Sequence, residues 1–272
     1  MRSVWALASV GLAACSLVTS LGGLGGADAS APDAGTDAAT DVAQDMTAVD
    51  AGIDADAAEA SCGFAGPTTG LVAYYPFEEG QGDVVHDCSP NHFDGTFVQQ
   101  ASWAAGKKGD GIFVQATSGC VDFGVHPELE PLALSVSVWM NVTSFPAVGA
   151  SGYVVGESFN ADVDGWRFGS RVTDAGDLLG WEHGPGTEVD VPAPVPGAWH
   201  QVVVTFASGT LQLFLDGASV ETASGLPPIT YDGASLRVGC RADGANAFNG
   251  YLDEVRLYDR VLSASEIVSL AQ

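Results

Sequence analysis

Positive charge is scarce in this 272-residue chain, in which nine Lys and Arg residues face thirty-four Asp and Glu residues. The formal net charge of −25 would repel the phosphate backbone of DNA or RNA. The composition therefore excludes nucleic acid as a partner.

Signatures of nucleophilic and metal-dependent catalysis are also missing. The sequence contains no Gly-x-Ser-x-Gly elbow and no Ser-x-x-Lys motif, and its one run of paired glycines, "GGLGG", does not join a strand to a helix. Its five histidines do not have the spacing of a zinc protease. We therefore expect no catalytic residues and predict that the protein is not an enzyme.

The first fifteen residues, "MRSVWALASVGLAAC", combine one positive charge with an apolar run that is too short to cross a bilayer as a helix. They resemble a bacterial lipoprotein signal, 1–15, and this resemblance implies that Cys15 is lipidated. The residue after Cys15 is Ser16 and not the aspartate of inner-membrane lipoproteins, so in this respect the chain resembles lipoproteins of the outer membrane. The alternative is an ordinary signal peptide that is cleaved after Ala29. Both interpretations predict export.

Residues 16–61 contain no aromatic residue and no Lys or Arg. Asp33, Asp37, Asp41 and Asp45 recur at every fourth position, where a helix would stack their like charges on one face. The segment is predicted to be a disordered linker, although its aspartates could also bind calcium loosely. Such a linker would hold residues 62–272 away from a membrane.

Four cysteines remain after Cys15, and they are Cys62, Cys88, Cys120 and Cys240. An even number in an exported chain predicts two disulfides, but four cysteines allow three connectivities. The sequence does not choose among these, and we favour Cys62 with Cys88 and Cys120 with Cys240. Zinc binding is the alternative, yet no pair has the short spacing of a zinc knuckle.

Residues 62–272 consist of short β-branched and aromatic runs that are separated by Gly, Asp, Asn and Pro, which is typical of strands. The segments "ASGT" and "LDGAS" predict two tight hairpins. Near the C-terminus, Ser263 and Glu266 form the pattern of a capping box and predict one short helix. The sequence thus predicts an all-β domain, a two-sheet antiparallel sandwich with a short C-terminal helix.

Five segments in order carry a resemblance to a known family. They are "GLVAYYPFEEGQG", "HDCSPNHFDGTF", "LSVSVWM", "GAWHQVVVTF" followed by "LQLFLDG", and "NGYLDEVRLYDRVLSASEI". Together they resemble the laminin-G-like jelly roll of the concanavalin A-like lectin/glucanase superfamily. The resemblance implies a binding or accessory module for glycans or proteins, often with bound calcium. Glucanases of this superfamily carry carboxylates at alternate positions of one strand, and this chain has no such run.

Asp253 and Glu254 are adjacent carboxylates in the predicted last strand. Neighbours on a strand point to opposite faces, so Asp253 would share the face of Val255 and Leu257, and Glu254 would form a surface pair with Arg256. A carboxylate on an apolar face needs hydrogen bonds or a cation.

The first and last strands often pair in such sandwiches, which would bring Asp253 near the loop after the first strand. We therefore predict a structural calcium ion held by side-chain and carbonyl oxygens. Its side-chain ligands would be Asp87, Asn91, Asp94 and Asp253. In the alternative interpretation, Asp253 accepts hydrogen bonds from backbone amides and the loop is an ordinary turn.

The segment "NADVDGWRFGSR" is a second calcium candidate. Asn160, Asp162 and Asp164 match the start of an EF-hand loop, but Arg171 stands where that loop has a glutamate. We favour an acidic turn between strands for this segment.

Four side chains of the middle strands are candidates for ligand binding. Arg167 and Arg171 share one face of a strand, and Trp181 and His183 share one face of the next. Tryptophan rings stack on sugars, and Arg or His can bind hydroxyl or carboxylate groups. In the alternative interpretation the tryptophans are core residues.

These observations predict a lipid-anchored surface protein whose jelly-roll domain binds a glycan and a structural calcium ion. Its membrane contact would be the lipid alone, at the outer membrane or cell surface. The alternative is a module that binds an envelope or extracellular protein and has no sugar site. An exported glycan-active enzyme is a third and less favoured interpretation.

Overall fold

The computed structural model describes residues 62–63, 65–116, 119–159, 164–184 and 186–272. The predicted signal (1–15) and linker (16–61) lie outside the described residues, as do Cys15, Asn160 and Asp162. Within the described part of the chain, no helix is long and apolar enough to span a membrane.

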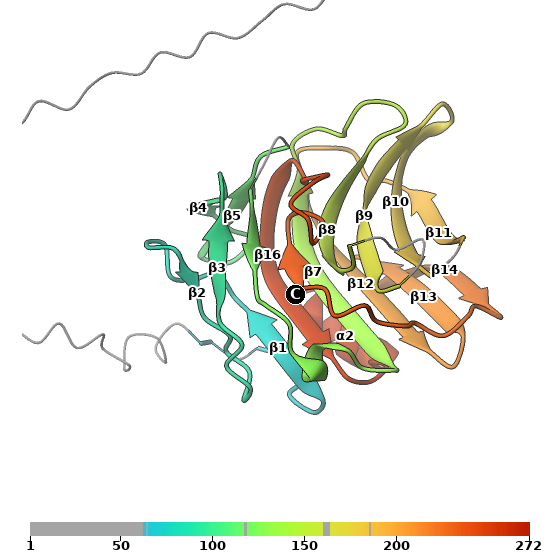
Figure 1. The fold of residues 1–272 in the computed structure, drawn as a ribbon, viewed down its shortest axis with the longest axis horizontal. Coiled ribbons are helices and arrows are strands. Elements are labelled where there is room, and N and C mark those ends of the chain that lie inside the picture. Colours follow the sequence, from blue (N-terminus) through green and yellow to red (C-terminus); the bar gives the residue numbers. More distant parts are fainter. Residues whose placement is uncertain (1–61, 64, 117–118, 160–163, 185) are drawn as a thin grey trace, which may run out of the picture. The chain divides into compact units, whose positions relative to one another are not determined.

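The domain consists of two antiparallel eight-stranded sheets, which confirms the predicted sandwich (Figure 1). Sheet A has the order β14-β13-β12-β7-β16-β5-β4, and β1 also pairs with β16. Its strands are β1 (Leu71–Tyr75), β4 (Ser102–Ala105), β5 (Asp110–Val114), β7 (Leu134–Val142), β12 (Trp199–Ala207), β13 (Thr210–Leu215), β14 (Ala218–Ser224) and β16 (Gly250–Tyr258).

Sheet B has the order β11-β10-β9-β8-β15-β6-β3-β2. Its strands are β2 (Val84–Val85), β3 (Gly95–Val98), β6 (Cys120–Asp122), β8 (Ser151–Glu157), β9 (Trp166–Thr173), β10 (Gly176–His183), β11 (Thr187–Pro192) and β15 (Arg237–Val238). A 3-10 turn, η1 (Pro127–Leu129), precedes β7, and one helix, α2 (Ala264–Leu270), follows β16.

The hydrophobic core lies between the two sheets and follows the period of two that strands impose. In β7, the alternate residues Val136, Val138 and Met140 point into it, and in β9, Trp166 and Phe168 do so. The intervening residues face outward on each sheet. Each sheet therefore has one outer face that is free to carry other groups.

Both predicted hairpins are confirmed. The β12–β13 turn places Ser208 at φ 49° and Gly209 at φ 72°, and the β13–β14 turn places Asp216 at φ 50° and Gly217 at φ 79°. Two successive residues with positive φ are typical of the two-residue turns that match the twist of paired strands. Glycine adopts this conformation without a steric penalty, which is why the sequence indicated both turns.

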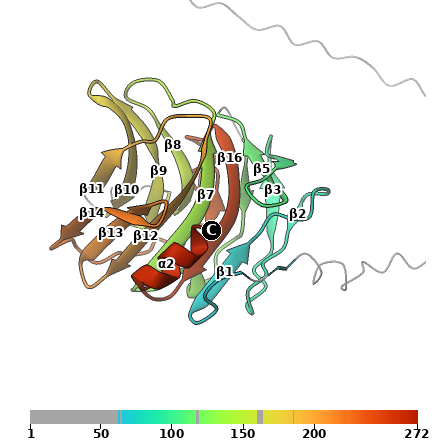
Figure 2. The same ribbon diagram turned by 180° about the vertical axis from the view of Figure 1, so that it is seen from behind.

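Helix α2 begins with the predicted capping box, in which Ser263 accepts a hydrogen bond from the Glu266 amide and Glu266 accepts one from the Ser263 amide. Its buried residues Ile267 and Leu270 pack in a cluster with Val203 of sheet A. Figure 2 shows α2 in front of the strands of sheet A. The helix therefore covers the outer face of this sheet.

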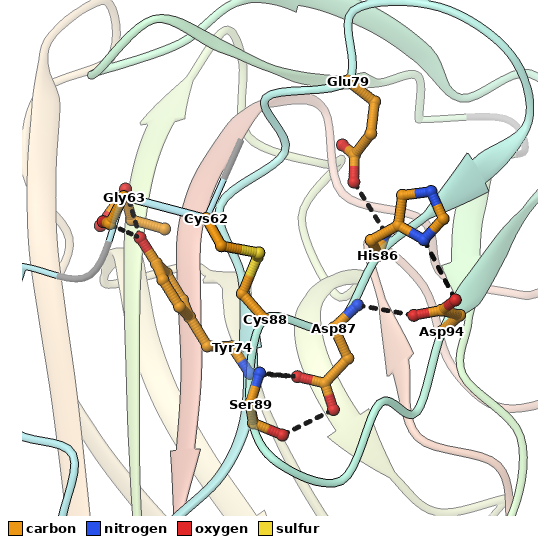
Figure 3. The surroundings of a disulfide bond; sticks show 10 residues. Cys62, Gly63, Tyr74, Glu79, His86, Asp87, Cys88, Ser89 and Asp94 are labelled. Carbon is orange, nitrogen blue, oxygen red and sulfur yellow. Dashed lines mark hydrogen bonds and ion pairs between the residues drawn. A yellow bond between two sulfur atoms is a disulfide. The ribbon is translucent and has the colours of Figure 1, made fainter. Parts of the chain in front are cut away.

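Residues 62–63 and 65–67 also lie against sheet A. The side chain of Arg256 donates to the Ala65 carbonyl at 3.1 Å, and the hydroxyl of Tyr258 donates to the Pro67 carbonyl at 3.1 Å. The disulfide Cys62–Cys88 fastens this segment to the loop that follows β2 (Figure 3). A second disulfide, Cys120–Cys240, joins β6 to the segment after β15, so the favoured pairing of the four cysteines is confirmed.

Strand β16 contains a β-bulge that sequence parity did not predict. Asp253 pairs with Trp139 and Arg256 pairs with Ser137, so two residues of β16 lie opposite one residue of β7. Glu254 takes a positive φ of 54° there. The bulge reverses the alternation, because one extra residue shifts every later side chain to the other face.

The prediction that Asp253 and Glu254 point to opposite faces of the strand is therefore wrong. Leu252 before the bulge and Val255 after it both point into the core. Asp253 lies opposite the outward-facing Trp139, and Glu254 and Arg256 share that outer face of sheet A.

Candidate functional site

The outer face of sheet B carries Arg167 and Arg171, as predicted, because Trp166 and Phe168 occupy the inward positions of β9. Arg167 lies opposite Glu182 of β10, with Nη2 at 2.6 Å from Oε2. The guanidinium of Arg167 also lies over the ring of Tyr153, at 4.7 Å from its centroid. A cation over an aromatic face and a paired carboxylate together fix this arginine in place.

Arg171 bridges two acidic residues of β11. Its Nη1 lies 2.6 Å from Oε2 of Glu188, and its Nη2 contacts Asp190. The side chain of Asp190 lies over Gly180, where an added Cβ would come 2.1 Å from its Oδ1. Gly180 is therefore required for Asp190 to reach across β10 to Arg171.

A hollow of about 320 Å³ opens over these residues. Its side-chain lining includes Tyr153, Arg167, Arg171, Glu182 and Glu188. Among the residues that the structure describes, three buried polar atoms in this network have no hydrogen-bond partner, namely Arg167 Nη1, Arg171 Nε and Asp190 Oδ1. Such groups normally find partners. The groups that a polar ligand in the hollow can reach are the partly exposed guanidinium of Arg171 and the carboxylate of Glu188.

The charges of this face nearly cancel, since two arginines meet three carboxylates. Burial raises the pKa of Asp190 above its ordinary value, while the neighbouring Arg171 acts in the opposite direction. Sequence reasoning found both arginines but missed the three acidic partners. The alternation of side chains within β10 and β11 could have shown which acidic residues share one face of each strand. It could not have shown that this face is the one that carries the arginines, because that depends on how the strands pair.

Trp181 and His183 belong to the core, which contradicts their predicted role in ligand binding. Both are 0% exposed, and the Trp181 ring stacks on Trp166 at 4.9 Å with an interplanar angle of 5°. Trp181 Nε1 donates to His183 Nδ1 at 2.8 Å, and His183 Nε2 donates to the Pro227 carbonyl at 3.0 Å. Burial lowers the pKa of His183, which fits this neutral tautomer. Their shared face is the inward face of β10.

The carboxylate of Asp87 organises its own loop. Oδ1 accepts from the amides of Tyr74 and Ser89, and Oδ2 accepts from the Ser89 hydroxyl and the Phe93 amide. These four hydrogen bonds occupy the acceptor positions that a cation would need. Figure 3 shows Asp87 turned toward Tyr74 and Ser89.

The other two loop residues are likewise engaged. Asn91 Nδ2 donates to the Val72 carbonyl at 2.8 Å. Asp94 accepts from the Asp87 amide at 2.9 Å and contacts His86 Nδ1 at 3.1 Å. In the second candidate calcium site, Asp164 Oδ1 accepts a hydrogen bond from the Thr230 hydroxyl at 2.5 Å. The other two predicted ligands of that site, Asn160 and Asp162, lie outside the described residues.

Asp253 contacts a different turn from the one predicted. Its Oδ2 accepts from the amides of Lys107 and Lys108, at 2.8 and 2.9 Å, in the turn between β4 and β5. Its Oδ1 is buried and has no partner within the described part of the chain, and burial raises the pKa of Asp253 to about 7.

These contacts match the alternative interpretation, in which Asp253 accepts hydrogen bonds from backbone amides and the loop of Asp87 is an ordinary turn. Among the residues that the structure describes, no three His, Cys, Asp or Glu side chains form a metal-binding group. These side chains therefore do not fit a shared calcium ion, and calcium binding stays a prediction.

Glu254 is buried, whereas the sequence predicted a surface pair. It is 4% exposed, its Oε2 lies 2.5 Å from Arg256, and it accepts from the Tyr74 hydroxyl at 3.1 Å. The Arg256 guanidinium lies 4.0 Å from the centroid of the Tyr74 ring. Helix α2 and residues 62–63 and 65–67 cover this face of sheet A, which the alternation of side chains along the strand does not reveal.

A laminin G family model, described as concanavalin A-like lectin/glucanases superfamily, matches residues 115–268. Human neuronal pentraxin-2 is 29% identical over 164 residues, which are 53% of this chain and 34% of the pentraxin. The zebrafish adhesion G-protein coupled receptor V1 is 32% identical over 80 residues, 28% of this chain and 1% of the receptor. The chain thus spans about a third of the pentraxin's length.

Solved structures show the same fold at low sequence identity. Domain 4 of an extracellular arabinanase from Geobacillus stearothermophilus, in complex with arabinotriose, has a TM-score of 0.59 and 18% identity, and the match covers 74% of this chain and 98% of that domain. Trypanosoma rangeli sialidase in complex with sialic acid has a TM-score of 0.58 and 16% identity, over 78% of this chain and 36% of the sialidase. These similarities support the jelly-roll fold.

Proposed function

The chain belongs to the laminin-G-like family of the concanavalin A-like lectin/glucanases superfamily, and on this premise we propose that it is an exported module that binds a carbohydrate on the outer face of sheet B. The observation that carries the proposal is the hollow lined by Arg167, Arg171, Glu182 and Glu188. A fold alone does not specify a ligand, so the chemistry of this face has to supply the argument.

Sugar hydroxyls both donate and accept hydrogen bonds, and they match a face that offers both functions. The guanidinium of Arg171, whose side chain is 21% exposed, can donate, and the carboxylate of Glu188, whose side chain is 53% exposed, can accept. Hydrogen bonds to charged groups are stronger than those between neutral groups. The ion pairs also hold these side chains in place before the ligand arrives, which lowers the entropy that binding loses.

Charge favours a neutral saccharide over an acidic one. The five charged side chains of the face sum to −1, and the whole chain carries −25, so a carboxylate or sulfate ligand would be repelled. The arabinanase domain solved with arabinotriose supports the proposal that this fold can present a glycan site, although its 18% identity extends only to the fold.

We propose binding rather than catalysis for this face. Glu182 and Glu188 are each held in an ion pair with an arginine of the same face. A glycosidase needs two carboxyl groups that act on one bond from opposite sides, one of which stays protonated for part of the cycle.

Binding of another protein is the alternative function, and a second hollow favours it. This hollow, of about 460 Å³, is lined mainly by apolar residues that include Leu132, Phe206, Leu226 and Ile229. Leu132 is 80% exposed. Exposed apolar patches often mark protein interfaces.

Two disulfides indicate that the domain folds in an oxidising compartment, as expected for an exported protein. The proposal of a lipid anchor at Cys15, in the outer membrane or at the cell surface, rests on the sequence of the first fifteen residues. Loss of lipid labelling in a Cys15→Ser variant would test it, with Cys15→Ala expected to behave alike.

A glycan array with the full-length chain tests the main proposal. We expect binding to at least one neutral oligosaccharide, and a loss of at least tenfold in affinity for Glu188→Gln, which keeps the side-chain shape but removes the charge. The matched control is Glu266→Gln, because Glu266 pairs with Arg260 in a comparable surface contact far from the hollow in sequence. Absence of glycan binding, or equal loss in both variants, would contradict the proposal.

A further inference from the structure

We propose that the open end of the outer face of sheet A binds a saccharide that carries a carboxylate group. This site lies on the other sheet from the hollow of the proposed function, takes a ligand of different charge and does not depend on that proposal. Three observations carry the inference: a row of aromatic rings outside the core, free polar groups at the edges of these rings, and a lysine that has no ion pair.

The aromatic strip consists of Phe113, Tyr251 and Trp199, with Asn141 between the last two. Phe113 of β5 lies opposite Tyr251 of β16, and Asn141 of β7 pairs with Tyr251 on one side and with Trp199 of β12 on the other. The strip faces outward, because the neighbours of these residues in β5, β7 and β16 belong to the core and paired residues share a face. The ring centroids of Phe113 and Tyr251 are 5.0 Å apart, and those of Tyr251 and Trp199 are 6.4 Å apart. The rings thus form one continuous surface across neighbouring strands.

These rings take no part in the packing of the core. Neither hydrophobic cluster among the described residues includes Phe113, Tyr251 or Trp199, and all three side chains are partly exposed. The cover of sheet A ends beside them: Trp139, the preceding outward residue of β7, is 4% exposed and donates from Nε1 to the Leu270 carbonyl of α2 at 3.3 Å. A contiguous group of exposed aromatic rings normally marks a binding surface.

The polar groups of the aromatic strip are free to bind a ligand. Within the described part of the chain, Trp199 Nε1, the Tyr251 hydroxyl and the side-chain amide of Asn141 have no hydrogen-bond partner. A sugar ring has apolar C–H groups on its faces, which stack on aromatic rings, and hydroxyl groups at its edge, which bond to such polar groups. An aliphatic protein surface would leave the same three groups desolvated and unpaired, at a cost. The chemistry of the strip therefore favours a saccharide.

Lys107 favours an anionic group on that saccharide. Among the eight Lys and Arg residues in the described part of the chain, it is the only one without an ion pair. Its Nζ lies 4.3 Å from the centroid of the Trp139 ring, and this cation–π contact holds the ammonium group in place. Trp139 and Asn141 are two residues apart on one strand, which is about 7 Å, so a carboxylate on a sugar bound to the strip can reach Nζ.

The acidic groups near this lysine do not occupy its ammonium group. Asp253 is fully buried, and its Oδ2 accepts from the backbone amide of Lys107. Glu254 is buried and pairs with Arg256. The net charge of −25 acts over longer distances, and salt at physiological concentration screens charges that are more than about 8 Å away. At contact distance the ammonium group of Lys107 therefore attracts a carboxylate.

Isothermal titration calorimetry of the full-length chain with uronic-acid oligosaccharides tests the proposal. The probes are trimers of galacturonate, glucuronate and mannuronate, each compared with its methyl ester, which keeps the sugar rings but removes the charge. We expect at least one acid to bind and its methyl ester to bind several-fold more weakly. The difference between the two should shrink as the salt concentration rises, because salt screens the ammonium group.

Variants of the aromatic strip separate stacking from charge. Trp199→Ala should weaken binding of the acid and of its ester alike, by about tenfold, because both lose the stacked ring. Lys107→Gln should weaken only the acid, and Lys107→Arg should restore it, since arginine keeps the charge. Glu188→Gln is the control on sheet B and should leave uronate binding unchanged. Melting temperatures equal to that of the wild type show that each variant folds.

The proposal is overturned if none of the three uronates binds, or if Trp199→Ala and Lys107→Gln bind the acid as tightly as the wild type. It is also overturned if the wild type sediments as a dimer that Trp199→Ala dissociates, because the strip then joins two copies of the chain. Loss of neutral-glycan binding in Glu188→Gln with intact uronate binding would show that the two sites are separate. Absence of neutral-glycan binding in the wild type would contradict only the proposed function.

Discussion

The outer faces of the two sheets carry the same kinds of side chain but differ in what covers them. On sheet A, Arg256 lies over Tyr74 and pairs with Glu254, and on sheet B, Arg167 lies over Tyr153 and pairs with Glu182. The sheet A face is covered by α2 and by residues 62–63 and 65–67, whereas the sheet B face keeps a hollow of about 320 Å³. What covers a sheet, more than the residue types on it, decides whether a charge network is structural or open to a ligand.

The covered network on sheet A leaves little free hydrogen-bonding capacity. Glu254 accepts from Arg256 and Tyr74, and Arg256 also donates to the Ala65 carbonyl. On sheet B, by contrast, Arg171 and the half-exposed Glu188 line the hollow, where a ligand can reach them. We therefore expect perturbation of the first network to change stability, and perturbation of the second to change binding.

The largest expected effect is on the covered face. Arg256→Ala leaves the buried Glu254 carboxylate without its main partner, and the free energy of unfolding should fall by about 3–5 kcal/mol. Urea denaturation measures this. Arg171→Ala is the matched control on the open face, where the partly exposed pairs should contribute about 1 kcal/mol or less. Equal losses in the two variants would remove the distinction between the faces.

Removal of the Cys62–Cys88 disulfide should have the next largest effect. The bond closes a loop with a sequence separation of 26 residues, and the double variant Cys62→Ser/Cys88→Ser should lose about 3 kcal/mol of stability. It should also make residues 62–63 and 65–67 more accessible to protease, because the bond fastens this segment to the domain. Unchanged proteolysis at this segment would show that its backbone contacts suffice without the bond.

Asp253 should make stability depend on pH. Burial raises its pKa in the folded state to about 7, above the ordinary value of 3.8, so its neutral form is favoured in the fold. The contribution of this group is complete below about pH 4 and is lost as the pH rises toward 7, with a slope of at most about 1.4 kcal/mol per pH unit.

Asp253→Asn should remove this part of the pH dependence, because an amide keeps an acceptor for the Lys107 and Lys108 amides but does not titrate. Denaturation curves at several pH values between 4 and 7 provide the measurement. A wild-type slope that persists in the variant would assign the pH dependence to another buried acid, such as Glu157.

Much of the fold could be predicted because its signals are local. The period of two in β7, the positive φ values that Gly209 and Gly217 permit, and the Ser263–Glu266 capping box all depend on a few adjacent residues. The pairing of the first and last strands followed from the family resemblance and was also confirmed, as β1 with β16.

The sites were harder to predict because they depend on distant segments. The bulge at Glu254 occurs where β16 changes its neighbour from β5 to β1, and no glycine marks it in the sequence. The prediction that Trp181 and His183 share a face of one strand is correct. Whether that face points inward or outward depends on the pairing of the strand in the sheet, and in the structure it points inward.

Hydrogen exchange with and without the glycan identified on the array tests the central claim most directly. With the full-length wild-type chain, the account predicts that the glycan slows exchange in β8, β9 and β11, around the hollow of Tyr153, Arg167 and Arg171, and leaves β16 and α2 unchanged. Slower exchange confined to α2 and to residues 62–63 and 65–67 would contradict it, because the ligand would then lie on the face that the structure shows as covered.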